Sequence, residues 1–159
     1  MNITVISFTK KGIEINLKLG EILKEHKIFA YSIQRYITVD NILPLLNLKK
    51  TVEERFLDDA IIFIGATGIA IRAVAPYLKD KFSDPAVIVI DELGQFVIPV
   101  LSGHAGGANE LANFIAKKLT ALSVITTATD INDAFAVDVF AKKHNLVISS
   151  RKLAKDVSS

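Results

Sequence analysis

The sequence of 159 residues contains no cysteine and only three histidines. The lack of cysteine excludes disulfides, thiolate metal sites and a cysteine nucleophile, and it fits a reducing compartment. The histidines are not paired at the spacing of metal ligands, so we expect no metal held by the protein itself. A charge excess of one sign is also missing, because the formal net charge is +2 and acids and bases are mixed along the chain. A nucleic-acid partner is therefore not expected.

Long apolar runs are missing too. No stretch approaches the length that is needed to span a bilayer. A strand-like run from Ile3 to Ile6 starts after only two residues, which leaves no room for the basic start and cleavage site of a signal peptide. We therefore expect a protein without membrane contact, located in the cytoplasm.

Strand and helix patterns alternate along the chain. Apolar β-branched runs predict strands at 3–8, 60–64, 86–90 and 96–101, with weaker candidates at 28–33 and 123–127. Apolar residues at helical spacing predict helices over 15–23, part of 41–57, 71–78 and 108–119. The strands at 86–90 and 96–101 are separated by a short turn and are expected to form a hairpin. The alternation predicts an α/β fold with an open, mostly parallel sheet and helices on both faces, as in Rossmann-like domains.

Turn residues refine this prediction. Residues 9–12 read as a turn, Pro44 is expected in the first turn of a helix, and Pro76 should kink or restart the helix that contains it. The pattern changes after Asp130. We expect residues 1–130 to form one core domain and residues 131–159 to begin a middle region that is truncated at Ser159.

Glycine is scarce but concentrated. Six of the eight glycines lie in the 43 residues from Gly65 to Gly107. They form two clusters, Gly65-Ala-Thr-Gly-Ile-Ala-Ile-Arg72 and Ser102-Gly-His-Ala-Gly-Gly-Ala-Asn-Glu110, and each stands between a strand run and a helix pattern. Glycine lets backbone N–H groups turn toward a bound group, and a helix N-terminus favours negative charge. We expect both clusters, with the turn at 126–130, to bind anionic groups at the carboxyl edge of the sheet.

The second cluster contains His104, which is the first candidate for acid–base chemistry. A neutral imidazole can accept and return a proton near neutral pH. Backbone amides around it could hold an oxyanion, and nearby polar side chains could orient the ring or the substrate. The residues concerned are Ser102, Gly103, Gly106, Gly107, Asn109 and Glu110. A solvent-facing or helix-capping histidine is the alternative. Ser102 as a nucleophile is disfavoured, because the Gly-x-Ser-x-Gly pattern is missing.

The first cluster lacks the phosphate-loop and dinucleotide patterns. Thr67 and the amides after Gly65 and Gly68 could still hold a carboxylate, with Arg72 pairing to it in a two-pronged way. A surface helix arginine is equally compatible with the composition. Asp91 ends a strand run and reads either as a functional carboxylate or as a hairpin turn residue. Thr127 and Asp130 follow the last predicted strand and can likewise be read either as functional residues or as turn residues.

The two clusters belong to a longer pattern that resembles a known family. Its parts are residues 65–76, Lys79-Asp-Lys-Phe-Ser-Asp-Pro-Ala86, Val89-Ile-Asp-Glu92, residues 101–111 and Thr126-Thr-Ala-Thr-Asp130. In this order they closely resemble the cobalt-precorrin-5A hydrolases of anaerobic cobalamin biosynthesis. The first 60 residues match only loosely. Family members continue through a middle region and a C-terminal domain, so the resemblance implies that this chain could be inactive alone.

The resemblance implies a substrate and a reaction. Family members open a δ-lactone on a cobalt corrinoid, release acetaldehyde and leave cobalt-precorrin-5B. His104 would then serve as the base, and Asp91 or Glu110 as a second proton acceptor, while the glycine loops and Arg72 anchor the carboxylates of the macrocycle. No cofactor is expected, because the substrate carries the cobalt. The alternative is a non-catalytic tetrapyrrole-binding module in which His104 is an axial cobalt ligand. A nucleotide-binding domain is the third candidate, and a homodimer is left open.

Overall fold

The computed structural model describes residues 1–80, 82–103 and 106–127. Seven strands form one sheet in the order β3-β2-β1-β4-β5-β6-β7. The strands are β1 (Asn2–Ser7), β2 (Lys27–Ser32), β3 (Leu43–Pro44), β4 (Ala60–Ile64), β5 (Ala86–Ile90), β6 (Phe96–Leu101) and β7 (Leu122–Ser123). The helices are α1 (Lys10–Ile22), α2 (Leu48–Arg55), α3 (Thr67–Val74) and α4 (Ala108–Leu119), with short 3-10 helices η1 (Gln34–Tyr36) and η2 (Ala75–Tyr77).

Strand direction divides the sheet into two parts. The five strands from β3 to β5 are mutually parallel, whereas β6 pairs antiparallel to β5 and β7 pairs parallel to β6. The chain winds outward from β1 to β3 and then returns to start again at β4, so the strand order reverses between β1 and β4. The predicted α/β class, the mostly parallel open sheet and the hairpin of β5 and β6 are confirmed.

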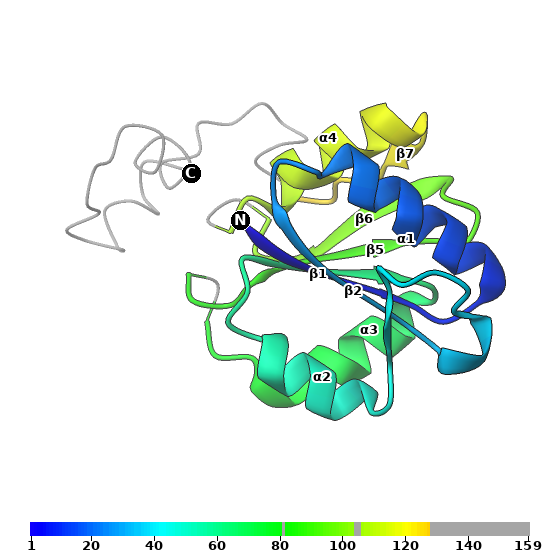
Figure 1. Ribbon diagram of the computed structural model, residues 1–159. Coiled ribbons are helices and arrows are strands. Elements are labelled where there is room, and N and C mark those ends of the chain that lie inside the picture. Colours follow the sequence, from blue (N-terminus) through cyan, green and yellow to red (C-terminus); the bar gives the residue numbers. More distant parts are fainter. Residues whose placement is uncertain (81, 104–105, 128–159) are drawn as a thin grey trace, which may run out of the picture.

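Helices cover both faces of the sheet. Figure 1 shows α1 and α4 on one face and α2 and α3 on the other. All five residues of β4 and of β5 are buried, as the continuous apolar runs predict for strands that are covered on both sides. Alternate residues of β4 join different cores: Ile62 packs with the α1 and α4 side, and Phe63 with the α2 and α3 side.

Three local predictions concern the segment at 9–12, Pro44 and Pro76. The segment at 9–12 is not a separate turn, because α1 begins at Lys10 and the Thr9 hydroxyl caps it by accepting a hydrogen bond from the Gly12 amide at 3.0 Å. Pro44 does not begin a helix. It lies in the short edge strand β3, where a missing N–H is tolerated. Pro76 restarts the chain as η2 directly after α3, as predicted.

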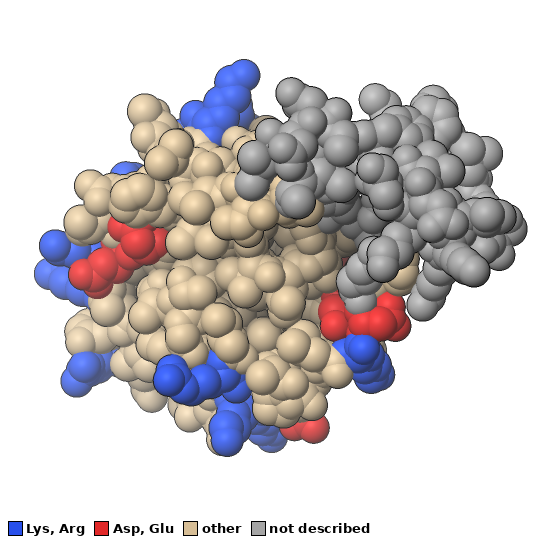
Figure 2. Space-filling model, turned by 180° about the vertical axis from the view of Figure 1, so that it is seen from behind, with Lys and Arg blue, Asp and Glu red and all other residues tan. Residues whose placement is uncertain are grey.

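The surface carries both signs of charge. On the face that Figure 2 shows, Lys and Arg side chains lie in several separate groups around an uncharged centre, and Asp and Glu lie beside some of them. Among the described residues, no helix combines the length and the apolar character that crossing a membrane requires.

Candidate functional site

The two glycine clusters lie at opposite edges of the sheet. Gly65 follows β4 at the carboxyl edge of the parallel strands, and its amide donates to Ile90 O at 2.8 Å. Ser102 follows β6, which runs in the reverse direction, and Leu101 pairs with Val87 near the start of β5. Our expectation that both clusters share the carboxyl edge is therefore wrong. The five residues of β5 separate the two edges by about 16 Å, so the clusters do not contact the same reacting group.

At the amino edge, Ser102 and Gly107 bound a loop and both have a left-handed backbone. Ser102 has a φ of +57° and Gly107 a φ of +78°, and the left-handed region is uncommon for a serine. The Ser102 hydroxyl donates to the backbone carbonyl of Asp84 at 3.0 Å, just before β5. Non-glycine residues in this region persist where their surroundings over-determine them, and they cluster at functional sites.

The same loop is closed by very close packing. A Cβ added to Gly106 would lie 2.3 Å from Ser102 Cβ, so only glycine fits there. The first amides of α4 turn back onto the loop: Ala108 N donates to Ser102 O at 3.2 Å and Asn109 N donates to Gly103 O at 3.0 Å. These two amides are therefore engaged by the loop itself rather than presented to an anion.

Two further candidates join this loop. The Asn109 side chain is 6% exposed, and its Nδ2 donates to Thr127 Oγ1 at 3.0 Å. Glu110 lies in the first turn of α4 and is exposed. The structure thus brings together Ser102, Gly103, Gly106, Gly107, Asn109 and Thr127, and Glu110 follows Asn109 in α4. His104, Asp130 and the boundary near residue 130 lie outside the described residues.

The carboxyl-edge cluster is a tight turn into α3. A Cβ on Gly65 would lie 3.0 Å from the ring of Phe8, which follows β1. Thr67 is the first residue of α3, and no side chain caps this helix. The turn lies beside the point between β1 and β4 where the strand order reverses, and open α/β sheets bind ligands at such points. Gly65, Thr67 and Gly68 therefore lie beside such a point, and their binding of an anion stays a prediction.

Arg72 and Asp91 have structural contacts at this edge. Arg72 is exposed, and its Nη1 donates to Gly68 O at 3.1 Å, one turn earlier in α3. The Asp91 carboxylate accepts hydrogen bonds from the amides of Leu93, Gln95 and Phe96 at 3.1, 2.7 and 2.6 Å. These bonds make Asp91 the anchor of the turn between β5 and β6. Its catalytic role stays a prediction, and it lies at the opposite edge from the loop that contains His104.

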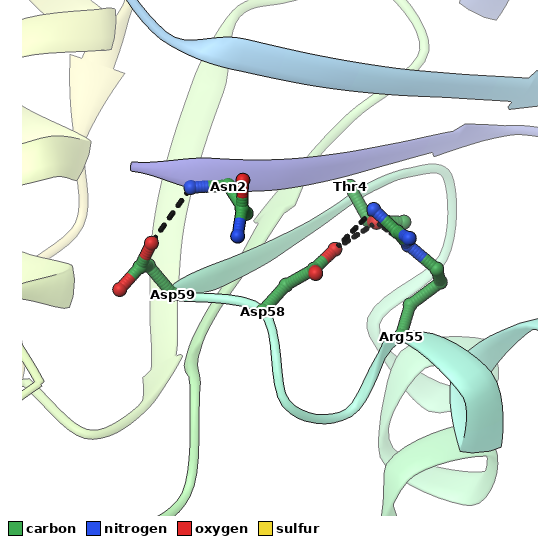
Figure 3. Close-up of polar contacts among 5 residues, drawn as sticks. All are labelled: Asn2, Thr4, Arg55, Asp58 and Asp59. Atoms are coloured by element: carbon green, nitrogen blue, oxygen red, sulfur yellow. Dashed lines mark hydrogen bonds and ion pairs between the residues drawn. The ribbon is translucent and has the colours of Figure 1, made fainter.

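A polar network also occupies the amino edge (Figure 3). Asp58 Oδ2 pairs with Arg55 Nη2 at 3.0 Å and accepts the hydroxyl of Thr4 at 2.6 Å, while Arg55 Nε donates to Thr4 Oγ1 at 3.1 Å. The guanidinium of Arg55 lies 3.2 Å from the ring centroid of Phe29. Next to it, Asn2 N donates to Asp59 Oδ2 at 2.6 Å. This network joins the end of α2 to β1, β2 and the start of β4.

Comparison with known proteins identifies the family. Residues 50–130, which contain both glycine clusters, match the family described as Cobalamin synthesis G N-terminal. The chain belongs to this family. The resemblance that the sequence shows is thus confirmed, and the family is one of cobalamin biosynthesis.

Individual relatives agree with this assignment. The chain is 59% identical to the cobalt-precorrin-5A hydrolase of Salmonella typhimurium over 95 residues, which are 60% of this chain and 27% of that protein. It is 39% identical to the cobalt-precorrin-5A hydrolase of Priestia megaterium over 98% of this chain and 42% of that protein. A crystal structure of a cobalamin biosynthesis protein G homologue from Sulfolobus solfataricus shares the fold, with a TM-score of 0.63 and 24% identity over 99% of this chain and 44% of that one. The chain spans less than half the length of these relatives.

Sequence reasoning missed two contacts that shape the two glycine-rich loops of this chain. One is the carbonyl of Asp84, a main-chain acceptor that no side-chain pattern signals. The other is Phe8, whose ring sets the space beside Gly65. In the part of the chain that the structure describes, no group of three His, Cys, Asp or Glu side chains could hold a metal ion.

Proposed function

We propose that this chain takes part in the reaction of the cobalt-precorrin-5A hydrolases: opening of the δ-lactone of a cobalt corrinoid, followed by release of acetaldehyde to give cobalt-precorrin-5B. The observation that carries the proposal is membership of the family over residues 50–130, together with two relatives of that name. The substrate brings its own cobalt, so the protein needs to supply binding, proton transfer and oxyanion stabilisation.

We assign the chemistry to the amino-edge loop. His104 stands between Gly103 and Gly106 in the sequence, and the described parts of this loop have the constrained backbone that functional sites often show. In the proposed reaction, the His104 imidazole accepts a proton from the water that adds to the lactone carbonyl. Backbone amides of the loop stabilise the oxyanion. The ester C–O bond then breaks to leave a carboxylate and an alkoxide. The alkoxide becomes the carbonyl of acetaldehyde as a carbon–carbon bond breaks, and the electron pair of that bond stays on the macrocycle, which takes up a proton.

Glu110 is the better second proton acceptor. It begins α4 at the same edge as the loop and is exposed, whereas the Asp91 carboxylate is bound by three amides at the other edge. The loop from Gly65 to Arg72 cannot reach the same ester, so its anion-binding role is a separate prediction. We further propose a cytoplasmic location, which the absence of cysteine favours. A homodimer stays a prediction.

The test measures acetaldehyde directly. The chain is incubated with cobalt-precorrin-5A, alone and as a longer polypeptide that includes the region present in the relatives, and aldehyde release is coupled to an NADH-dependent reductase. We expect His104→Ala to lower kcat on the order of 100-fold or more, because general base catalysis typically contributes that much. His26→Ala is the matched control and should leave turnover unchanged, since His26 lies in the turn between α1 and β2.

Two outcomes would contradict the proposal. If His104→Ala keeps near wild-type turnover, His104 is not the general base. If neither polypeptide releases acetaldehyde, the chain does not take part in the hydrolase reaction. Optical spectra distinguish a catalytic role of His104 from its role as a cobalt ligand in a non-catalytic binding module. If His104 is an axial ligand, the corrinoid bands shift on binding, and the shift is lost in His104→Ala without any aldehyde release.

A further inference from the structure

Asn109 is a buried polar side chain in a helix face that is otherwise apolar. The buried residues of α4 besides Asn109 are Ala108, Leu111, Ala112, Ile115 and Ala116. Burying an amide costs free energy unless hydrogen bonds compensate it, and an alanine would serve the core packing of this face without that cost. Core packing therefore does not explain why this position carries an asparagine.

The contacts of Asn109 show what it joins. Its Nδ2 donates to Thr127 Oγ1 at 3.0 Å, and Thr127 follows β7. On the other side it packs against the loop, because a Cβ added to Gly103 would lie 2.9 Å from Asn109 Oδ1 and 3.0 Å from Nδ2. The backbone amide of Asn109 also donates to Gly103 O at 3.0 Å. The side chain thus lies between the loop and the segment after β7.

The other end of the loop is tied in a comparable way. Ser102 Oγ donates to Asp84 O at 3.0 Å, and Ser102 keeps its left-handed φ of +57°. A strained residue of this kind costs about 1–3 kcal/mol and persists only when neighbouring contacts hold it. Two segments remote in sequence, one before β5 and one after β7, therefore set the position of the loop.

We propose that Asn109 is a positioning residue: through Thr127 it fixes Ser102 and Gly103, the start of the loop, against α4 at the amino edge, and it does not itself contact the substrate. This replaces our sequence-based prediction that Asn109 and Thr127 bind substrate. The consequence for catalysis rests on the proposed function, because the loop contains His104. The effect of Asn109 on the position of the loop does not depend on the proposed function.

The decisive variants change Thr127, which is partly exposed and outside the strands. Thr127→Val keeps the shape and removes the hydroxyl that accepts from Asn109, whereas Thr127→Ser keeps the hydroxyl. Amide hydrogen exchange is followed at Ala108 and Asn109, whose N–H groups close the loop onto Ser102 and Gly103. We expect Thr127→Val to speed exchange there about fivefold or more, the factor that the loss of a typical hydrogen bond gives. Exchange at Ile62 in β4 should be unchanged, and Thr127→Ser should behave like the wild type.

Turnover provides the second measurement. In the polypeptide that releases acetaldehyde, Thr127→Val and Asn109→Ala should lower kcat severalfold with little change in KM, and the double variant should be no worse than the more severe single one, because the two residues act as a unit. A rise in KM with kcat unchanged would show direct substrate binding and overturn the inference. Unchanged exchange in Thr127→Val would overturn it as well. If the wild type releases no acetaldehyde, the proposed function fails, while exchange still decides whether Asn109 and Thr127 hold the loop.

Discussion

The polar network at the amino edge allows a quantitative prediction of stability. Asp58 pairs with Arg55 at 3.0 Å and accepts the hydroxyl of Thr4 at 2.6 Å (Figure 3). The side chains of Arg55 and Asp58 are only 19% and 10% exposed, and Thr4 is fully buried. Replacing Asp58 by alanine leaves the guanidinium of Arg55 in this mostly buried place without its carboxylate.

The magnitude follows from burial. Removing one partner of a buried ion pair costs about 3–5 kcal/mol, and the residual exposure of Arg55 puts Asp58→Ala at the lower end, about 3 kcal/mol. Asp58→Asn keeps an oxygen for the Thr4 hydroxyl and loses only the charge, so its cost should be about 1–2 kcal/mol. For a chain of this length, about 3 kcal/mol corresponds to a fall in Tm of about 6–12 °C.

The assay is urea unfolding followed by circular dichroism, with Glu54→Ala as the control. Glu54 also pairs with a cation on α2, but its contact with Lys50 is 3.8 Å long and the two side chains are 61% and 72% exposed. Such a surface pair contributes less than about 1 kcal/mol. If Asp58→Ala destabilises the protein no more than Glu54→Ala does, the network is not a buried ion pair in solution and the reasoning fails.

Two further predictions concern α1. Gly20→Ala should raise the free energy of unfolding by about 0.5–1 kcal/mol, because nothing lies within 4 Å of an added Cβ and alanine is the better helix former. Gly12→Ala is its control and should give no such gain, since its Cβ would meet Ser7 Cβ at 3.3 Å; equal stabilisation by both changes would contradict the packing. Thr9→Ala should cost about 1 kcal/mol in urea unfolding by removing the N-cap bond to Gly12. Thr9→Ser should cost much less, and equal losses in the two variants would argue against the cap.

Most of the fold could be predicted because its signals are local. The runs at 60–64 and 86–90 are continuously apolar, and both strands are buried throughout, as such runs imply. The errors arose where tertiary context decides. Thr9 could begin a turn or cap a helix, and only the packing of α1 on the sheet decides between them. Proline has no backbone N–H donor, and both the first turn of a helix and an edge strand tolerate this absence. The residue type of Pro44 alone therefore could not assign it to β3.

The candidate site illustrates the same limit at longer range. Residue types and spacing identified the two glycine clusters, and the family match over residues 50–130 contains both. Whether they share one edge depends on the direction of β6. The short turn before β6 already predicted a hairpin, and a hairpin returns the chain to the edge from which β5 started. Consistent use of that one prediction would have placed Ser102 beside Asp84 and separated it from Gly65.

This separation changes what each edge can do. The carboxyl edge beside the reversal between β1 and β4 is the usual place of a ligand site in open α/β sheets. The amino edge has the strained, doubly tied loop that precedes α4. Because β6 and β7 both run against the other strands, the loop before α4 and Thr127 after β7 meet at the amino edge, whereas in a fully parallel sheet they would meet at the carboxyl edge. The reversed hairpin is therefore the feature that places the proposed reaction site at the edge opposite the Gly65 loop.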